Sequence, residues 1–171
     1  VDADDLPFFM EVMTHLASKG MSCPLPVAAR DGSILQELMG RPCAVFSFLD
    51  GTSSRYPNRE KCRALGVSLA EMHLHASGVI RRRPNALGPQ SWQRLLDSVG
   101  ARADEIAPSM QAMAQTRLDS ILEAWPKDLP QGVIHADLFP NNVLFMGDNL
   151  TGVIDFYFAC DDIFAYDIGI C

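Results

Sequence analysis

The sequence has no apolar run near the ~18 residues that a membrane-spanning helix needs, and no segment with the pattern of a secretory signal peptide. Cysteine is also sparse: the five are odd in number, widely spread and never arranged as C-x-x-C. These absences argue against a disulfide scaffold or a zinc site and favour a reduced, cytoplasmic location. Because their neighbours are apolar, we expect the cysteines in the core: Cys23, Cys43, Cys62, Cys160 and Cys171.

Positive charge is scarce as well. The 14 Lys and Arg residues stand against 21 Asp and Glu, for a formal net charge of −7. An acidic surface repels polyanions, so neither nucleic acid nor an anionic membrane is an expected partner. A nucleotide bound through a metal cation stays compatible. With 171 residues, 48% of them hydrophobic, the chain can bury one sizeable core or two small lobes.

What the sequence does contain is a compact acidic motif. His135, Asp137 and Asn142 occupy one polar stretch after a short apolar run, and Asp155 ends a later apolar run. Two apolar runs around Gly-Asp-Asn predict a β-hairpin at 143–146 and 152–154. This hairpin would bring the two carboxylates and the carboxamide to one edge. Hard oxygen ligands at one edge suit Mg²⁺.

Periodicity, caps and turn residues predict the other elements. We expect a first helix from residues 4–5 to about 19, with Pro7 in its first turn and Gly20 as its stop. Three strand-like runs follow, at 26–29, 34–39 and 44–49. A long helix capped by Asn58 carries His73 and His75, which point apart and therefore form no metal pair; at least one should be packed or capping. Further helices are expected at 91–100 and 103–125.

The acidic motif resembles the catalytic loop of protein kinases, which has His-x-Asp, an Asn five residues later and a subsequent Asp-Phe. Ala136 stands where those kinases have Arg, and Tyr157 where they have Gly. With these departures the chain resembles the aminoglycoside phosphotransferase and choline kinase superfamily. That resemblance implies small-molecule kinase chemistry that uses ATP and Mg²⁺.

The same resemblance assigns expected roles. Asp137 would accept the proton of the substrate hydroxyl, while Asn142 and Asp155 would hold the metal. His135 would anchor the catalytic loop rather than act as the base. Asp167, on the helix that follows, would brace the loop through backbone hydrogen bonds.

Longer stretches are similar to the bacterial homoserine kinase family of this superfamily: 133–140, 154–160 and 165–168, with weaker similarity at 46–51 and 85–87. This similarity implies an α+β, protein-kinase-like fold of two lobes. Residues 1–50 would complete the N-terminal lobe, with a hinge near 47–51, and residues 51–171 would form a mostly helical C-terminal lobe. The implied activity is ATP-dependent phosphorylation of the L-homoserine hydroxyl.

The resemblance also implies ligand contacts. The Ser47 carbonyl and the Leu49 amide would bind the adenine edge at the hinge, and Glu11 would pair with a phosphate-binding lysine. A helix-face carboxylate in solvent is an equally good interpretation of Glu11. Arg83 and Asn85 are candidates for binding the substrate, since Arg grips carboxylates well, although three adjacent arginines are more often a solvated loop.

The sequence lacks a glycine-rich phosphate loop and a strand lysine before the first helix, which such kinases use. We therefore expect a partial chain, truncated at both ends, that transfers phosphate poorly alone. Three alternatives stay open. These are a sibling kinase for choline, methylthioribose or an aminoglycoside, a non-catalytic nucleotide-binding module, and a metal-dependent hydrolase. The sequence predicts no oligomeric state.

Overall fold

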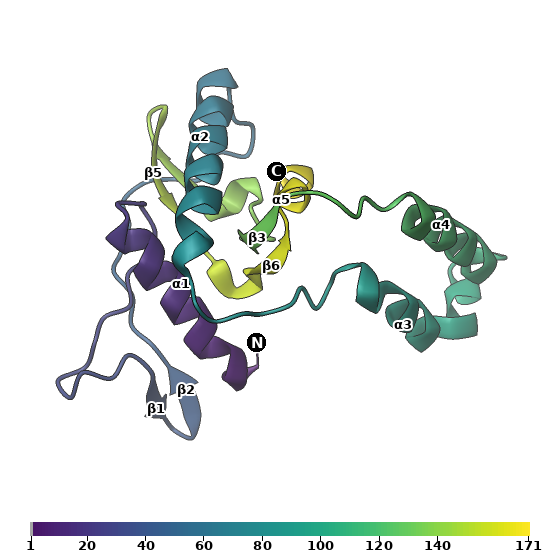
Figure 1. The fold of residues 1–171 in the computed structure, drawn as a ribbon, viewed down its shortest axis with the longest axis horizontal. Coiled ribbons are helices and arrows are strands. Elements are labelled where there is room, and N and C mark those ends of the chain that lie inside the picture. The colour runs from purple at the N-terminus through teal and green to yellow at the C-terminus, as the bar shows by residue number, and fades with distance from the viewer. Residues whose placement is uncertain (1) are drawn as a thin grey trace. The chain divides into compact units, whose positions relative to one another are not determined.

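A computed structural model describes residues 2–171, which form two compact units. The larger unit comprises the chain up to Pro84 together with Pro130–Cys171, and the smaller is Asn85–Leu129. These two units are not the two predicted lobes, since they divide after Pro84 and Leu129. The predicted lobe boundary near residue 50 stays a prediction. Figure 1 shows their elements, and no described helix has the length and apolar character needed to cross a membrane.

In the larger unit, α1 spans Leu6–Ser18 and α2 spans Arg59–His75. Pro7 lies in the first turn of α1, and Gly20 follows its end with a positive φ of 88°, so this helix agrees with the sequence prediction. Asn58 caps α2 by accepting a hydrogen bond from the Lys61 N–H at 2.9 Å. Both helices bury one apolar face, which holds Phe9, Val12 and Leu16 in α1 and Leu69 and Met72 in α2.

The described strands form three antiparallel pairs. They are β1 (Gln36–Leu38) with β2 (Arg41–Cys43), β3 (Gln131–Ile134) with β6 (Cys160–Ile163), and β4 (Val143–Met146) with β5 (Asn149–Val153). The predicted hairpin is β4–β5, with Gly147 at a positive φ of 62° in its turn. Strand β6 was not predicted.

Two of the three early strands were predicted wrongly. Residues 26–29 and 44–49 meet only in an isolated bridge between Pro26 and Phe46, with hydrogen bonds from Val27 N–H to Val45 O and from Ser47 N–H to Leu25 O. Pro26 lacks an N–H and so cannot extend a ladder. Only the middle run contains regular strand, at β1.

The core lies between α1, the end of α2 and the strands around the hairpin. Two of the five cysteines are buried, Cys23 in this core and Cys160 in β6, and burial raises the pKa of Cys160 to about 12. Cys43 is half-buried, and Cys62 and Cys171 are exposed, so the expectation of five core cysteines was wrong. Apolar neighbours in sequence do not decide which face of an element a side chain occupies. Cys62 shares a face of α2 with Leu69, but it borders a hollow there and stays exposed.

The smaller unit is a helical hairpin of α3 (Pro89–Val99) and α4 (Met110–Ala124) (Figure 1). Trp92 and Trp125 meet edge to face at 5.0 Å, and the Gln93 and Gln115 amides exchange two hydrogen bonds of 2.9 Å. The second helix begins later than predicted, because Gly100–Glu105 forms a 3₁₀ turn. A short helix α5 (Phe164–Ile170) ends the chain, in the larger unit.

Candidate active site

The polar stretch after β3 folds into a tight loop around Asp137. The Asp137 carbonyl accepts a hydrogen bond from the Phe139 N–H at 2.8 Å, and Pro140–Asn142 then forms a 3₁₀ turn that leads into β4. The buried Asn142 amide donates from Nδ2 to the Asp137 carbonyl at 2.7 Å and to the Asp137 carboxylate at 3.0 Å. The loop therefore holds Asp137 and Asn142 in direct contact.

His135 is fully buried beneath this loop and packs against the Phe156 ring, with centroids 4.7 Å apart. Its Nε2 lies 2.9 Å from the Ile154 carbonyl, and its Nδ1 accepts from the Asp137 N–H at 3.3 Å. The first contact needs a proton on Nε2 and the second needs a bare Nδ1, so both fit one neutral tautomer. Burial lowers the pKa of His135, against the opposing charges of Asp167, Asp137 and Asp155.

Asp167 of α5 has a fully buried carboxylate with three donors. It accepts from the His135 N–H at 2.9 Å, from the Ala136 N–H at 2.7 Å and from His73 Nε2 at 2.9 Å. Ala136 has a positive φ of 63°, a left-handed conformation that costs an L-residue roughly 1–2 kcal/mol. The two charge-assisted contacts of Asp167 with the His135 and Ala136 N–H groups offset that cost and fix the backbone just before Asp137.

Sequence reasoning missed the contribution of His73. It considered this residue only as a packed or capping histidine, whereas the ring also stacks on Phe164 at 4.3 Å and hydrogen-bonds Asp167. The available signal was a histidine on the buried face of a helix, where its polar nitrogen needs a partner. The identity of that partner, 94 residues away, has no local signature.

Asp155 differs from the other acidic groups of the site. It is exposed, adopts a left-handed conformation (φ 66°, ψ 58°), and its carboxylate has no hydrogen bond or ion pair within residues 2–171. The N–H of the preceding residue, Ile154, donates to the Asn142 carbonyl at 2.9 Å. This backbone contact brings the start of the Asp155 turn next to Asn142. The exposed Asp155 carboxylate and the Asn142 amide oxygen, which also accepts from Asn141 Nδ2 at 3.2 Å, are oxygen ligands of the kind that Mg²⁺ takes.

The predicted hinge borders a hollow of about 260 Å³ that also reaches Asp155. Met13, Leu144 and Tyr157 line it together with Ser47 and Leu49. Among the described residues, the Ser47 carbonyl and the Leu49 N–H have no hydrogen-bond partner. Burial, reinforced by the Asp155 charge, raises the pKa of Tyr157. An apolar slot with one free backbone donor and one free acceptor suits a flat heteroaromatic ring.

Three predicted ligand-binding residues, Glu11, Arg83 and Asn85, make hydrogen bonds to other residues of the chain. The Glu11 carboxylate accepts from the Ile80 N–H at 2.6 Å and pairs with Arg81 at 3.3 Å, outside the hollow at the hinge. The Arg83 guanidinium donates from Nε to the Asp5 carboxylate at 2.8 Å. Asn85 belongs to the smaller unit, where its Oδ1 accepts from the Leu87 N–H at 2.9 Å just before α3. Glu11 and Arg83 thus bind residues outside the acidic motif, and the ligand contacts of all three residues stay predictions.

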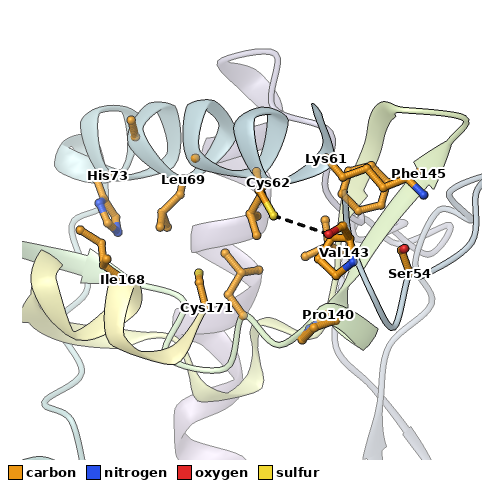
Figure 2. A pocket seen from close by; sticks show the side chains of 15 residues that line it. Ser54, Lys61, Cys62, Leu69, His73, Pro140, Val143, Phe145, Ile168 and Cys171 are labelled. Atoms are coloured by element: carbon orange, nitrogen blue, oxygen red, sulfur yellow. Dashed lines mark hydrogen bonds between the residues drawn. The ribbon is translucent and has the colours of Figure 1, made fainter. Parts of the chain in front are cut away.

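A second hollow, of about 520 Å³, lies alongside α2. Figure 2 shows Cys62, Leu69 and His73 of α2 on one side and Ile168 and Cys171 on the other. Its lining is almost wholly apolar, and neither carboxylate of the acidic motif lines it. Leu138 and Pro140 of the catalytic loop also line it, so this hollow adjoins the acidic motif without reaching its carboxylates.

These features define a class of protein. The chain has the fold of a solved amicoumacin kinase, hAmiN in complex with AMP-PNP, Ca²⁺ and Ami, with a TM-score of 0.79 at 18% identity over 99% of this chain and 52% of that one. The model of the phosphotransferase enzyme family matches residues 1–171. The chain belongs to that family, and the predicted α+β, protein-kinase-like fold is confirmed.

Within that class, the chain is similar to homoserine kinases. It is 54% identical over all 171 residues to the homoserine kinase of Allorhizobium ampelinum and 54% identical to that of Rhizobium meliloti. It spans about half the length of these relatives, 53% and 52% respectively. The predicted resemblance to the homoserine kinase family is confirmed.

The buried neutral His135 makes stability depend on pH. Above pH 6.5 the ring is uncharged in both states; below it, the unfolded chain takes up a proton that the folded chain resists, so the free energy of unfolding falls. One such group changes it by at most about 1.4 kcal/mol per pH unit. We expect His135→Gln to flatten this fall between pH 7.5 and 5.5 in urea unfolding. His15→Gln, outside the site, serves as the control, and equal slopes for wild type and His135→Gln would contradict the assignment.

Proposed function

We propose that the intact protein containing this chain is a homoserine kinase, which uses ATP and Mg²⁺ to convert L-homoserine into O-phospho-L-homoserine for threonine biosynthesis. The carrying observation is the contact of Asp137 with Asn142 beside an unpartnered Asp155. The 54% identity to homoserine kinases supports L-homoserine as the acceptor of the phosphoryl group. The proposed location is the cytoplasm.

The proposed reaction assigns one role to each group. The substrate hydroxyl oxygen attacks the γ-phosphorus, the bond from that phosphorus to the leaving oxygen of ADP breaks, and the hydroxyl proton passes to the Asp137 carboxylate. Asn142 Nδ2 keeps that carboxylate oriented. Asn142 Oδ1 and Asp155 would hold Mg²⁺, which neutralises phosphate charge when bound. Since the transition state is loose, positioning and charge neutralisation supply most of the rate.

The nucleotide base would lie in the hollow at the hinge. There the Ser47 carbonyl would accept from the adenine amino group, and the Leu49 N–H would donate to a ring nitrogen. Met13 and Leu144 supply apolar surface for the two faces. This pose leads the triphosphate toward Asp155, which borders the same hollow.

A substrate panel on the intact protein tests the proposal. We expect ADP formation to depend on L-homoserine and to be far slower with choline, methylthioribose or an aminoglycoside, measured in a coupled assay. Preference for one of these acceptors would identify a sibling kinase. Phosphate release without any acceptor would identify a hydrolase, and nucleotide binding without turnover a binding module.

The proposed base is tested by Asp137→Asn in the intact protein. The amide cannot accept the hydroxyl proton, so kcat should fall by about 10²-fold or more. Nucleotide affinity should change little, because Asp137 does not line the hollow at the hinge. The exposed Asp128→Asn variant controls for the loss of one negative charge. A near-normal kcat for Asp137→Asn would remove this residue from the role.

The proposed metal ligand is tested by two substitutions at Asp155. Asp155→Ala removes the carboxylate but also strains a left-handed position, whereas Asn tolerates that conformation. Both variants should lose Mg²⁺-dependent turnover while circular dichroism shows an intact fold. Comparing the two variants separates the effect of losing the carboxylate from the effect of straining the backbone. Activity of either variant with an unchanged Mg²⁺ requirement would overturn the assignment.

A further inference from the structure

Arg83 is the most enclosed member of the only basic run. Its side chain is 18% exposed, against 59% and 61% for Arg81 and Arg82. Those two make ion pairs at the surface, a type of contact that contributes little to stability. The burial of Arg83 therefore needs its own explanation.

Three partners surround the Arg83 guanidinium. Nε donates to the Asp5 carboxylate at 2.8 Å, Nη1 donates to the Ala159 carbonyl at 3.2 Å, and Cζ lies 5.1 Å from the centre of the Phe9 ring. A guanidinium can direct donors to two acceptors and lay its face on a ring, which an ammonium cannot do. The contact set matches the shape of arginine.

The Arg83 backbone is fixed as well. Its N–H donates to the Asp161 carboxylate at 2.8 Å, and its carbonyl accepts from the Asp161 N–H at 2.7 Å. These contacts attach Arg83 to the start of β6. The guanidinium therefore reaches Ala159 from a rigid base.

Ala159 closes the turn that carries Asp155. Its N–H donates to the Phe156 carbonyl at 3.0 Å, so Phe156–Phe158 forms a single 3₁₀ turn directly after Asp155. Phe156 packs on His135 inside the core, and Tyr157 meets Phe9 of α1 edge to face at 5.5 Å. Arg83 thus links the beginning of α1, through Asp5, to the end of the Asp155 turn.

We propose that Arg83 is a positioning residue for the metal-binding Asp155: it sets the direction of that carboxylate by holding the following turn against α1. The exposed carboxylate has no protein partner of its own, so its place beside Asn142 depends on the backbone on both sides. On the preceding side, the Ile154 N–H is bound to Asn142. On the following side, Arg83 supplies the polar contact. This inference rests on the proposed function.

The proposal changes the expected role of Arg83. The sequence suggested that it grips the substrate carboxylate, but Asp5 already occupies its Nε edge. A positioning role predicts a defect in metal-dependent nucleotide binding. A substrate-binding role predicts instead a raised KM for homoserine.

The test compares Arg83→Met and Arg83→Lys with Arg81→Met in the full-length protein. Arg81→Met is the matched control, because it removes one charge from the same run at an exposed position without touching Asp161, which holds the Arg83 backbone. Affinity for ADP is measured by calorimetry with Mg²⁺ and with EDTA, alongside the Mg²⁺ concentration for half-maximal turnover and the KM for homoserine. Asp5→Asn provides a second route to the same defect if Arg83→Met fails to fold.

We expect Arg83→Met and Asp5→Asn to weaken ADP binding in Mg²⁺ by about 10-fold or more, the usual effect of losing a group that orients a metal ligand. Binding in EDTA and the KM for homoserine should match the wild type. Arg83→Lys should recover only part of the loss, because one ammonium cannot replace both donors. A raised homoserine KM with normal Mg²⁺ dependence, or an equal loss in EDTA, would overturn the proposal. Wild-type turnover of homoserine tests the proposed function separately.

Discussion

The acidic site depends on one buried carboxylate. Asp167 is fully enclosed, and a charge in that position is tolerated only when it is well hydrogen-bonded. Its three donors are the backbone N–H groups of His135 and Ala136 and the ring of His73. Through these contacts a helix at the end of the larger unit holds a loop some 30 residues earlier in a conformation that an unassisted alanine avoids.

The rest of the loop builds on that support. His135 is locked in one tautomer between the Ile154 carbonyl and the Asp137 N–H, so it connects the loop to the backbone that leads to Asp155. Asn142 then ties the Asp137 carboxylate to the hairpin. Within the loop, Asp137 and Asn142 are partners of each other. The Asp155 carboxylate, the Ser47 carbonyl and the Leu49 N–H have no hydrogen-bond partner in the described chain, and these groups face the metal and the nucleotide in the proposed function.

The three consecutive arginines of this chain have different surroundings. Arg81 and Arg82 make surface pairs, whereas Arg83 is enclosed between Asp5, Ala159 and Phe9. Nothing in three consecutive arginines distinguishes them, because their surroundings come from α1 and β6. The same limit applies to the cysteines, of which two are buried and two exposed despite similar neighbours in sequence.

The sequence by itself determined the features that depend on neighbouring residues. The extent of α1 to within two residues, the presence of the β4–β5 hairpin, the Asn58 cap and the order of Asp137, Asn142 and Asp155 follow from apolar periodicity, turn residues and spacing, whereas β5 begins three residues before the predicted strand. Only the tertiary structure decided the contacts made over long separations: His73 with Asp167, Arg83 with Asp5, and Glu11 with the backbone at Ile80. A side chain's local pattern states which bonds it can make, but its partner is chosen by how distant elements pack.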